Sequence, residues 1–542
     1  MSEEHPGQGP LNDDKKNEKK HLLKAAATMG SMTLASRILG MFRDIVSANA
    51  FGTTWQWDAF LYAFMIPNFL RRIVGEGAFS SAFIPVYNEL LHKEGKEAAF
   101  RFANACMSVL MTVLAVFILV VEIVLTGALQ LEGLSPTLRL TLDLLRYLFP
   151  YLWFVSLWAL TMGVLNSHRH FFSSALGPII LNLAWIAAVL YLLPRTRGGI
   201  NSELTFLAIV ISVEGVIQLA LEVPPLYRLG FRFRWVWDLA SPALAKVQRL
   251  VVPSLLSFAI FQINVLIDMT LGLMIGPGAN SSLWYGTRLM QLPLGVFAVA
   301  AGSALLPSAA RQKANADTEQ TKEMMSFALR GIFLIVIPCA VGLIVLARPI
   351  VQMLFEHGHF NAESTRRTSA VLVCYTVGLF AYSGQKILNN GFYGAQNTRI
   401  PMTVGGVALI VNVAVSLSLM HFLKEAGLAL ATSISGIFQF VALAVLYYRR
   451  VAAFDIKGTV FAFLRILAAS SAMGVVCICL FSMLETRLPG SGNWFHMIRV
   501  LTTMFLSVLS YPLFCLLFGV KEMKGLLEKI TPRFFRKRPA QP

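Results

Sequence analysis

The sequence predicts an all-α polytopic membrane protein, and three observations lead to this fold class. Of the 542 residues, 56% are hydrophobic and only 14% are charged, whereas soluble domains carry about 25% charged residues. Uncharged stretches of about 20 residues, each long enough to cross a bilayer as a helix, recur along almost the whole chain. Polar residues gather at the two ends, so disorder is excluded for the region between them.

Apolar windows predict about fourteen transmembrane helices. Representative uncharged stretches are residues 102–121, 171–194, 289–310, 400–420 and 426–448. We expect the helices to be centred near residues 37, 70, 112, 153, 182, 216, 260, 296, 336, 378, 410, 437, 472 and 508.

The charges of the loops predict that both termini lie in the cytoplasm. With the N-terminus inside, the cytoplasmic segments contain about 28 lysines and arginines and the opposite loops about 8, which follows the positive-inside rule. This asymmetry accounts for most of the +17 net charge without a nucleic-acid partner. We expect basic segments such as residues 228–234 and 521–538 to meet the anionic lipid headgroups of the membrane.

A weak internal repeat divides the predicted helices into two lobes. Pro67 and Pro85 precede one charged loop, and Pro293 and Pro307 precede another, six helices later. Because an offset of six helices preserves direction through the membrane, we expect two parallel six-helix lobes, followed by two added helices. The expected parts are a polar cytoplasmic extension (1–23), a first lobe (24–229), a second lobe (230–450), a C-terminal helix pair (451–520) and a basic cytoplasmic tail (521–542).

Ionisable side chains at bilayer depth are the most informative residues for function. Arg37, Arg43, Arg71 and Arg288 fall inside predicted helices, where each charge costs about 2.5–3.5 kcal/mol at the helix centre. Asp44 adjoins Arg43 and can neutralise it, but the other three arginines have no acid close in sequence. Surplus guanidinium groups in a hydrated cavity predict an anionic ligand, and their planar donors suit phosphate. The alternative is that some of these arginines extend to the interface or pair within the bundle.

Two further groups of polar residues lie within or near the ends of predicted helices. Gly75, Glu76 and Gly77 follow the arginine pair at residues 71–72 and predict either a hinge or close helix packing through small residues. Glu122, Glu214 and Glu222 lie toward the ends of predicted helices, where we expect them at the membrane interface. We attach no functional prediction to these three glutamates.

No pattern for catalysis stands out in the sequence. It has no Walker motif, no glycine-rich phosphate loop and no arrangement like a catalytic triad, and its polar segments are too short for an ATPase domain. We therefore expect a transporter rather than an enzyme, with no resident cofactor, driven by an ion gradient, the membrane potential or the substrate concentration. The six cysteines all lie in apolar segments, as expected of buried, inert thiols.

Three blocks in the N-terminal part of the chain carry a specific resemblance: Ser36–Asp44, Asp58–Phe60 and Ile66–Phe79. They are similar to the MurJ/MviN family of lipid II flippases, in the multidrug/oligosaccharidyl-lipid/polysaccharide exporter superfamily. Shorter similar stretches follow at Tyr285–Met290, Leu354–Phe360 and Gly391–Tyr393. The resemblance covers all the predicted helices and leaves out the polar extension and the extreme tail.

The resemblance implies a substrate and roles for the charged residues. The substrate is expected to be lipid II, an undecaprenyl-diphosphate-linked disaccharide-pentapeptide, moved from the cytoplasmic to the periplasmic leaflet of a bacterial inner membrane by alternating access. The two six-helix lobes are expected to surround a central cavity, and the last two helices are expected to form a groove for the polyprenyl tail. Arginines important in the family fall on Arg37, Arg43, Arg71 and Arg288, and Asp58 joins Asp44 as a matching acid. The cell-wall synthesis machinery is an expected partner.

Other functions fit the sequence less well. An exporter of another lipid-linked oligosaccharide, of the O-antigen type, or a drug exporter belongs to the same superfamily. The arginines of the first lobe disfavour cationic drugs, because like charges repel in a low-dielectric cavity. A membrane enzyme acting on polyprenyl phosphates requires convergent carboxylates that the sequence lacks, and a scaffold protein would not need buried arginines.

Some relatives are described with a sodium site in the second lobe, and the resemblance places its positions in this chain. They are Asp268, Asn412, Thr432 and a backbone carbonyl near Leu428, with Ser416 where those relatives have a second acid. One lost carboxylate weakens a sodium site. Two alternatives therefore stay open: Asp268 carries a proton, or it pairs with Arg288 as a gate.

Overall fold

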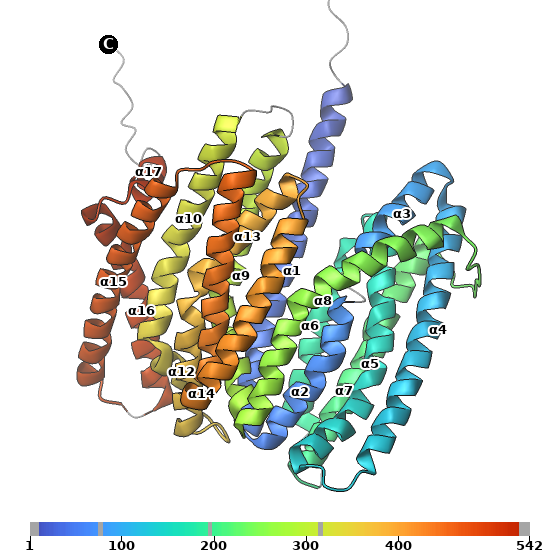
Figure 1. Cartoon of the computed structure of the whole chain (residues 1–542), viewed down its shortest axis with the longest axis horizontal. Helices are drawn as coiled ribbons and strands as arrows, with labels where there is room; N and C mark the ends of the chain where they lie inside the picture. Colours follow the sequence, from blue (N-terminus) through green and yellow to red (C-terminus); the bar gives the residue numbers. More distant parts are fainter. Residues whose placement is uncertain (1–9, 74–79, 193–197, 313–317, 491, 531–542) are drawn as a thin grey trace, which may run out of the picture. The chain divides into compact units, whose positions relative to one another are not determined.

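The computed structural model describes residues 10–73, 80–192, 198–312, 318–490 and 492–530. Within these ranges every regular element is a helix, so the all-α fold class is confirmed (Figure 1). The first half contains α1 (Pro10–Phe51), α2 (Trp55–Arg71), α3 (Ser80–Lys93), α4 (Lys96–Leu129), α5 (Pro136–Ser167), α6 (Phe171–Ala187), the short π-helix η2 (Ala188–Leu192), α7 (Ile200–Leu229) and α8 (Pro242–Ile275). The second half contains α9 (Ala279–Gln312), α10 (Thr318–Val345), α11 (Ala347–Phe355), α12 (Ala362–Val377), α13 (Leu379–Gly394), α14 (Arg399–Arg450), α15 (Ile456–Arg487), α16 (Asn493–Leu517) and α17 (Lys521–Ile530).

Several of these helices have the length and composition of membrane spans. Among the described residues, seven helices are long and apolar enough to cross a bilayer, or eight if the bent pair of α12 and α13 forms one span. The chain is therefore a multi-pass membrane protein. The count of about fourteen spans stays a prediction.

The 52-residue helix α14 is bent back on itself. Lys424 has a φ of 51° and a ψ of −132°, which is not helical. On either side of it, Asn412 Nδ2 donates to Thr432 Oγ1 at 3.1 Å, and Ser435 Oγ donates to the carbonyl of Ala408 at 2.5 Å. Residue numbers rise in one half as they fall in the other, so the two halves pack as an antiparallel hairpin.

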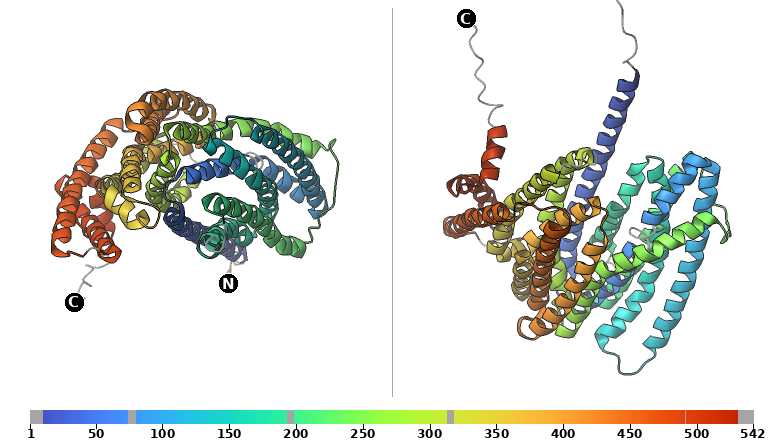
Figure 2. Two further views of the ribbon diagram at one scale, coloured as in Figure 1. Left: turned by 90° about the horizontal axis from the view of Figure 1, so that it is seen from below. Right: turned by 45° about the horizontal axis from the view of Figure 1, so that its top comes forward.

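The chain divides into two compact units, and the first comprises Met1–Ser47 and Ala59–Gln262. Its central helix is α5, most of which is buried against α7, α4 and α3, whereas α4 exposes most of its apolar surface. The two views of Figure 2 show α4 and α5 running side by side. Ser135 caps α5, its Oγ accepting from Leu138 N at 3.2 Å, and proline in the first turn fits this start.

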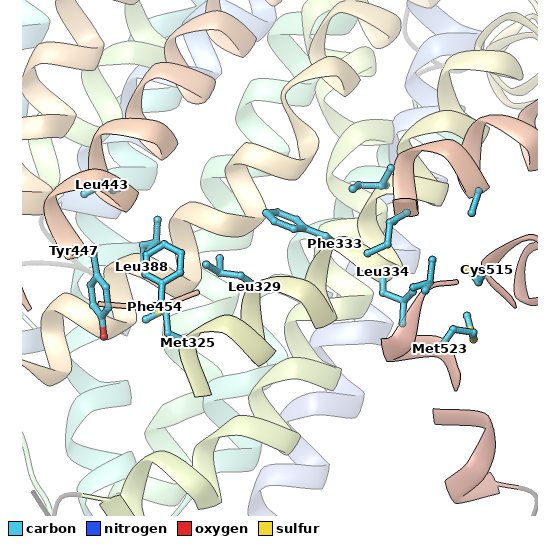
Figure 3. Close-up of a cluster of buried hydrophobic side chains, with 14 of the residues drawn as sticks. Met325, Leu329, Phe333, Leu334, Leu388, Leu443, Tyr447, Phe454, Cys515 and Met523 are labelled. Carbon is cyan, nitrogen blue, oxygen red and sulfur yellow. The ribbon is translucent and has the colours of Figure 1, made fainter. Parts of the chain in front are cut away.

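The second unit comprises Ala48–Asp58 and Ile263–Pro542. Its apolar core gathers side chains from α10, α13, α14, α15 and α16, with Phe333, Leu388 and Tyr447 among them (Figure 3). Asp455 caps α15, accepting from Gly458 N at 2.8 Å, and also accepts from Arg330 at 2.5 Å. The lobe, groove and tail bounds expected from the sequence stay predictions.

The turn between α1 and α2 packs within the second unit. The carbonyl of Asn49 accepts from His359 N at 3.0 Å, and the Thr53 and Ser364 hydroxyls lie 2.7 Å apart. Gly52 has a φ of +59°, and a Cβ there would lie 2.3 Å from the carbonyl oxygen of His359. The close approach therefore requires glycine at this turn, which leads directly into Asp58.

Candidate functional site

Two of the predicted arginines lie on α1, and the structure gives them different environments. Arg43 is 3% exposed, and its Nε and Nη2 donate to Asp44 Oδ1 at 3.0 and 2.6 Å. Arg37 lies two turns before Asp44 on the same face of the helix. Its side chain is exposed, and among the described residues it has no hydrogen bond or ion pair. Asp44 thus neutralises Arg43, and Arg37 keeps its charge available.

Arg43 is further held by α6. Its guanidinium lies over the ring of Trp185, 4.7 Å from the centroid, and Trp185 Nε1 donates to Ser47 Oγ at 3.0 Å. Asn182 Nδ2 donates to the carbonyl of Ser36 at 3.1 Å, one residue before Arg37. These contacts fix the α1 segment that carries both arginines against α6, so the guanidinium of Arg43 is a rigid, buried group.

The arginine pair at the end of α2 is only partly buried. Arg71 is half-buried, and its Nε donates to Asn68 Oδ1 at 3.0 Å. Arg72 is exposed and its Nη1 lies 3.5 Å from Gln262 Oε1. Asn68 therefore orients the guanidinium of Arg71, whose planar donors suit an anion. The hinge predicted at Gly75, Glu76 and Gly77 lies outside the described residues.

Arg288 and Asp58 belong to the second unit. Arg288, on α9, is half-buried and lies over the ring of Trp284, 4.9 Å from the centroid. Asp58 is 2% exposed and binds the start of α9, accepting from Gly278 N at 2.5 Å, Ser281 N at 2.7 Å and Ser281 Oγ at 2.5 Å. A carboxylate at a helix N-terminus satisfies free N–H groups and opposes the helix dipole, so Asp58 ties the α1–α2 turn to α9.

The five residues of the expected sodium site form one hydrogen-bonded network. Thr432 Oγ1 lies 3.0 Å from both Asp268 Oδ2 and the carbonyl of Leu428, and 3.1 Å from Asn412 Nδ2. Ser416 Oγ then donates to Asn412 Oδ1 at 3.3 Å. Asp268 is 6% exposed, and its Oδ1 has no hydrogen-bond partner among the described residues. One helix hairpin and α8 therefore bring a single carboxylate together with four neutral oxygens.

Two glutamates are placed differently from their prediction. Glu214 and Glu222 on α7 are 0% and 1% exposed, inside the packing of α7 with α5 and α6, so the expectation of an interfacial position is wrong for both. Glu122 on α4 is about one-third exposed and pairs with Arg146 at 2.6 Å. The signal for Glu214 and Glu222 was their spacing with Gln218, one turn apart on a face opposite the apolar residues.

Comparison with known proteins then decides the family. The family described as "Lipid II flippase MurJ" matches residues 47–498. The chain belongs to this family. A probable lipid II flippase MurJ of Vibrio cholerae is 33% identical over 441 residues, covering 79% of this chain and 82% of the relative. A lipid II flippase MurJ of Burkholderia cenocepacia is 32% identical over 425 residues, covering 76% and 81%.

Solved structures agree with the family. The structure titled "Lipid II flippase MurJ, inward closed conformation" superposes with a TM-score of 0.72 at 25% identity, covering 90% of this chain and 98% of that one. An inward-facing multidrug resistance MATE family transporter of the MOP superfamily gives 0.61 at 15% identity, covering 82% and 99%, which shows a shared fold only. Membership of the MurJ family makes the chain a flippase rather than an enzyme.

Proposed function

We propose that this member of the MurJ family moves lipid II from the cytoplasmic to the periplasmic leaflet of the bacterial inner membrane by alternating access. Family membership supports the substrate. The observation that carries the site is Arg37, an exposed guanidinium on α1 with no ion-pair or hydrogen-bond partner among the described residues. The sequence predicts that the chain crosses the membrane around this residue, and a charge at bilayer depth costs free energy that a bound anion would recover.

The four arginines are proposed to have different roles. Arg37, Arg71 and Arg288 would hold the diphosphate, whose negative oxygens match the planar N–H donors of guanidinium groups. Arg43 would act through its buried pair with Asp44, which stiffens the α1 segment beside Arg37. The glycan and pentapeptide would occupy the hydrated central cavity expected between the two six-helix lobes. The C-terminal helices α15 and α16, which pack together, would guide the polyprenyl tail.

Neutral variants of the three diphosphate arginines test this assignment. Arg37→Gln, Arg71→Gln and Arg288→Gln should each fail to support growth of cells depleted of their flippase, at normal expression levels. Arg366→Gln is the matched control, because Arg366 is exposed and paired with Glu363 at 2.6 Å. A leaflet-accessibility assay for lipid II should show cytoplasmic accumulation only for the first three. Growth of all three variants at the rate of the control variant would refute the assignment.

Asp58 is proposed as part of the gate. Its three hydrogen bonds hold the α1–α2 turn on the N-terminus of α9, and Arg367 adds a bond to the carbonyl of Pro277 at 2.7 Å. The sequence predicts all of these residues on the periplasmic side of the membrane. Opening that side would break the bonds and closing it would remake them.

The network around Asp268 fits a coupling ion of single positive charge. One carboxylate balances one charge, and the oxygens of Ser416, Thr432 and Leu428 add neutral ligands of the kind that alkali cations accept. Asp268 Oδ1, buried and with no hydrogen-bond partner among the described residues, is the oxygen open to an ion. We propose that the coupling ion, sodium or a proton, binds here, with the membrane potential as the other driving force.

The segment between α7 and α8 supports the proposed cytoplasmic orientation and contact with anionic lipids. Phe233, Trp235 and Trp237 are exposed in a row, the two tryptophan rings stacked 6.4 Å apart. The neighbouring Arg232 and Arg234 are exposed as well. Stacked aromatic rings beside arginines fit the interfacial layer of an anionic leaflet. Side chains in the first half of α4 form hydrogen bonds with the backbone of this segment.

The start of α8 is anchored close to the same segment. Glu89 on α3 accepts from Lys246 at 2.6 Å and from Lys93 at 2.9 Å. These hydrogen bonds from the two ammonium groups lower the pKa of Glu89 to about 2. The carboxylate therefore stays charged at physiological pH, and the anchor does not respond to pH there. The cell-wall synthesis machinery remains a proposed partner on either side of the membrane.

A further inference from the structure

A row of polar side chains runs along the buried face of α7. Glu214, Gln218 and Glu222 follow one another at intervals of four residues and therefore share one face of the helix. They are 0%, 3% and 1% exposed. Val213 and Ile217 are exposed on the other side of the helix. Since α7 packs against α5 and α6 (Figure 1), its polar residues point into the first unit and its apolar residues point outward.

This row contains more hydrogen-bond acceptors than donors. Both carboxylate oxygens of Glu214, Oε1 of Gln218 and Oε1 of Glu222 are buried without a hydrogen-bond partner among the described residues. Gln218 has two amide hydrogens, and its Nε2 donates one of them to the carbonyl of Gly177 at 2.7 Å. A buried acceptor left without a donor costs about 1–3 kcal/mol. The row therefore lacks hydrogen-bond donors, and a carboxyl group that binds a proton becomes a donor.

The contact between Glu222 and Thr161 shows the same shortage. Thr161 Oγ1 lies within hydrogen-bond distance of Glu222 Oε2 and also 2.9 Å from the carbonyl of Trp158, within its own helix. A hydroxyl has one hydrogen, so Thr161 cannot donate to both. If Thr161 donates to the carbonyl, as threonine in a helix commonly does, the hydrogen between Thr161 and Glu222 must come from Glu222. A protonated Glu222 satisfies both bonds.

Glu214 also has a positive charge in reach, because the guanidinium of Arg71 on α2 interacts electrostatically with it.

We propose that Glu214 and Glu222 form a proton-binding site in the first unit. The proposal does not depend on the proposed function, because it rests on buried oxygens of the row that have no hydrogen-bond partner among the described residues and on the single hydrogen of Thr161.

The surroundings of the row leave few other groups to explain a pH effect. Facing α7, α6 has no charged residue along its sequence, and η2 presents Tyr191. On α5, Tyr151 lies against Gly215 of α7, and Arg146 is engaged by Glu122 on α4. The remaining ionisable residues on these elements are Arg139, Asp143 and Tyr147 in the first half of α5, and Glu203, Tyr227 and Arg228 near the two ends of α7.

Infrared difference spectroscopy tests the proton site directly, without any transport. The protein in lipid nanodiscs, titrated from about pH 5 to about pH 9, should show the carbonyl stretch of a buried, protonated carboxyl group, at higher frequency than a hydrated acid. Glu214→Gln and Glu222→Gln should each remove part of this band. The matched control is Glu122→Gln, which removes an accessible, paired glutamate and should leave the band intact. A band unchanged in both α7 variants would overturn the proton site.

Discussion

Replacing Asp58 by asparagine should destabilise the second unit and impair flipping. The substitution keeps the size of the side chain but turns one of its two oxygens into an NH2 group. In the native structure both oxygens accept, Oδ2 from Gly278 N and Oδ1 from Ser281 N and Oγ. The amide oxygen can accept on one side only. On the other side the new NH2 group faces a backbone N–H, so two donors meet.

The cost follows from those three bonds. A hydrogen bond to a charged group stabilises by about 1.5–3 kcal/mol, and a bond between neutral groups by about 1 kcal/mol. Losing one charged bond and weakening the rest gives about 3–4 kcal/mol, and the lost attraction to the helix dipole adds about 0.3–1 kcal/mol. For a unit of this size the melting temperature should fall by about 5–10 °C.

Thermal melting in detergent, followed by tryptophan fluorescence, measures this shift. The matched control is Asp455→Asn, which also removes a capping carboxylate, from the start of α15, but at a site where the Asp455 side chain is 58% exposed. An exposed pair of this kind contributes about 0–1 kcal/mol, so the control should melt within about 3 °C of the wild type. Equal shifts in the two variants would refute the argument that burial of Asp58 makes its bonds strong.

Flipping assays separate a gate from a purely structural contact. If Asp58 closes the periplasmic side, Asp58→Asn should flip lipid II more slowly at a temperature well below its melting point. Ser281→Ala removes one of the three bonds and should have an intermediate effect. Wild-type flipping by Asp58→Asn under these conditions would leave Asp58 as a stabilising residue only.

Three further results are expected. Because breaking a buried ion pair costs about 3–5 kcal/mol whereas replacing both partners is nearly neutral, Arg43→Met should lower the melting temperature strongly and the added change Asp44→Leu should restore much of it. If the Asp268 network binds sodium, Thr432→Val should abolish any acceleration of flipping by sodium in proteoliposomes, and an intact acceleration would exclude the site. If the aromatic row lies in an anionic leaflet, brominated phosphatidylglycerol should quench tryptophan fluorescence less in the double variant Trp235→Ala/Trp237→Ala than in the wild type, and equal quenching would refute that placement.

The sequence predicted the features that depend on composition and on neighbouring residues. Apolar runs identified the helical, membrane-spanning character, because a bilayer of fixed thickness demands long uncharged stretches. Adjacency predicted that Asp44 neutralises Arg43, and the structure shows that pair. The resemblance to the MurJ/MviN family placed five residues in one site, and the structure joins them by hydrogen bonds from Asp268 through Thr432 to Ser416.

Features that depend on the packing of distant elements were beyond sequence reasoning. Nothing near Asp58 in the chain announces that it binds Gly278, because the two are 220 residues apart. Glu214 and Glu222 were misplaced because hydropathy windows average over a helix and discard which face a residue occupies. A check of periodicity would have put them on the buried face, since an apolar outer face at positions such as Val213 and Ile217 leaves the polar residues inside.

The strain at the tip of α14 is held in place by a neighbouring ion pair. Lys424 adopts a backbone geometry that glycine accepts and other residues avoid, at a cost of about 1–3 kcal/mol. The next residue, Glu425, is 4% exposed and accepts from Arg367 Nε at 2.5 Å, so the tip is pulled inward by an anchor on α12. The bond between Arg367 and Glu425 therefore holds the strained backbone of the hairpin tip in place. Removing this bond should let the tip relax while the two halves of the hairpin stay paired.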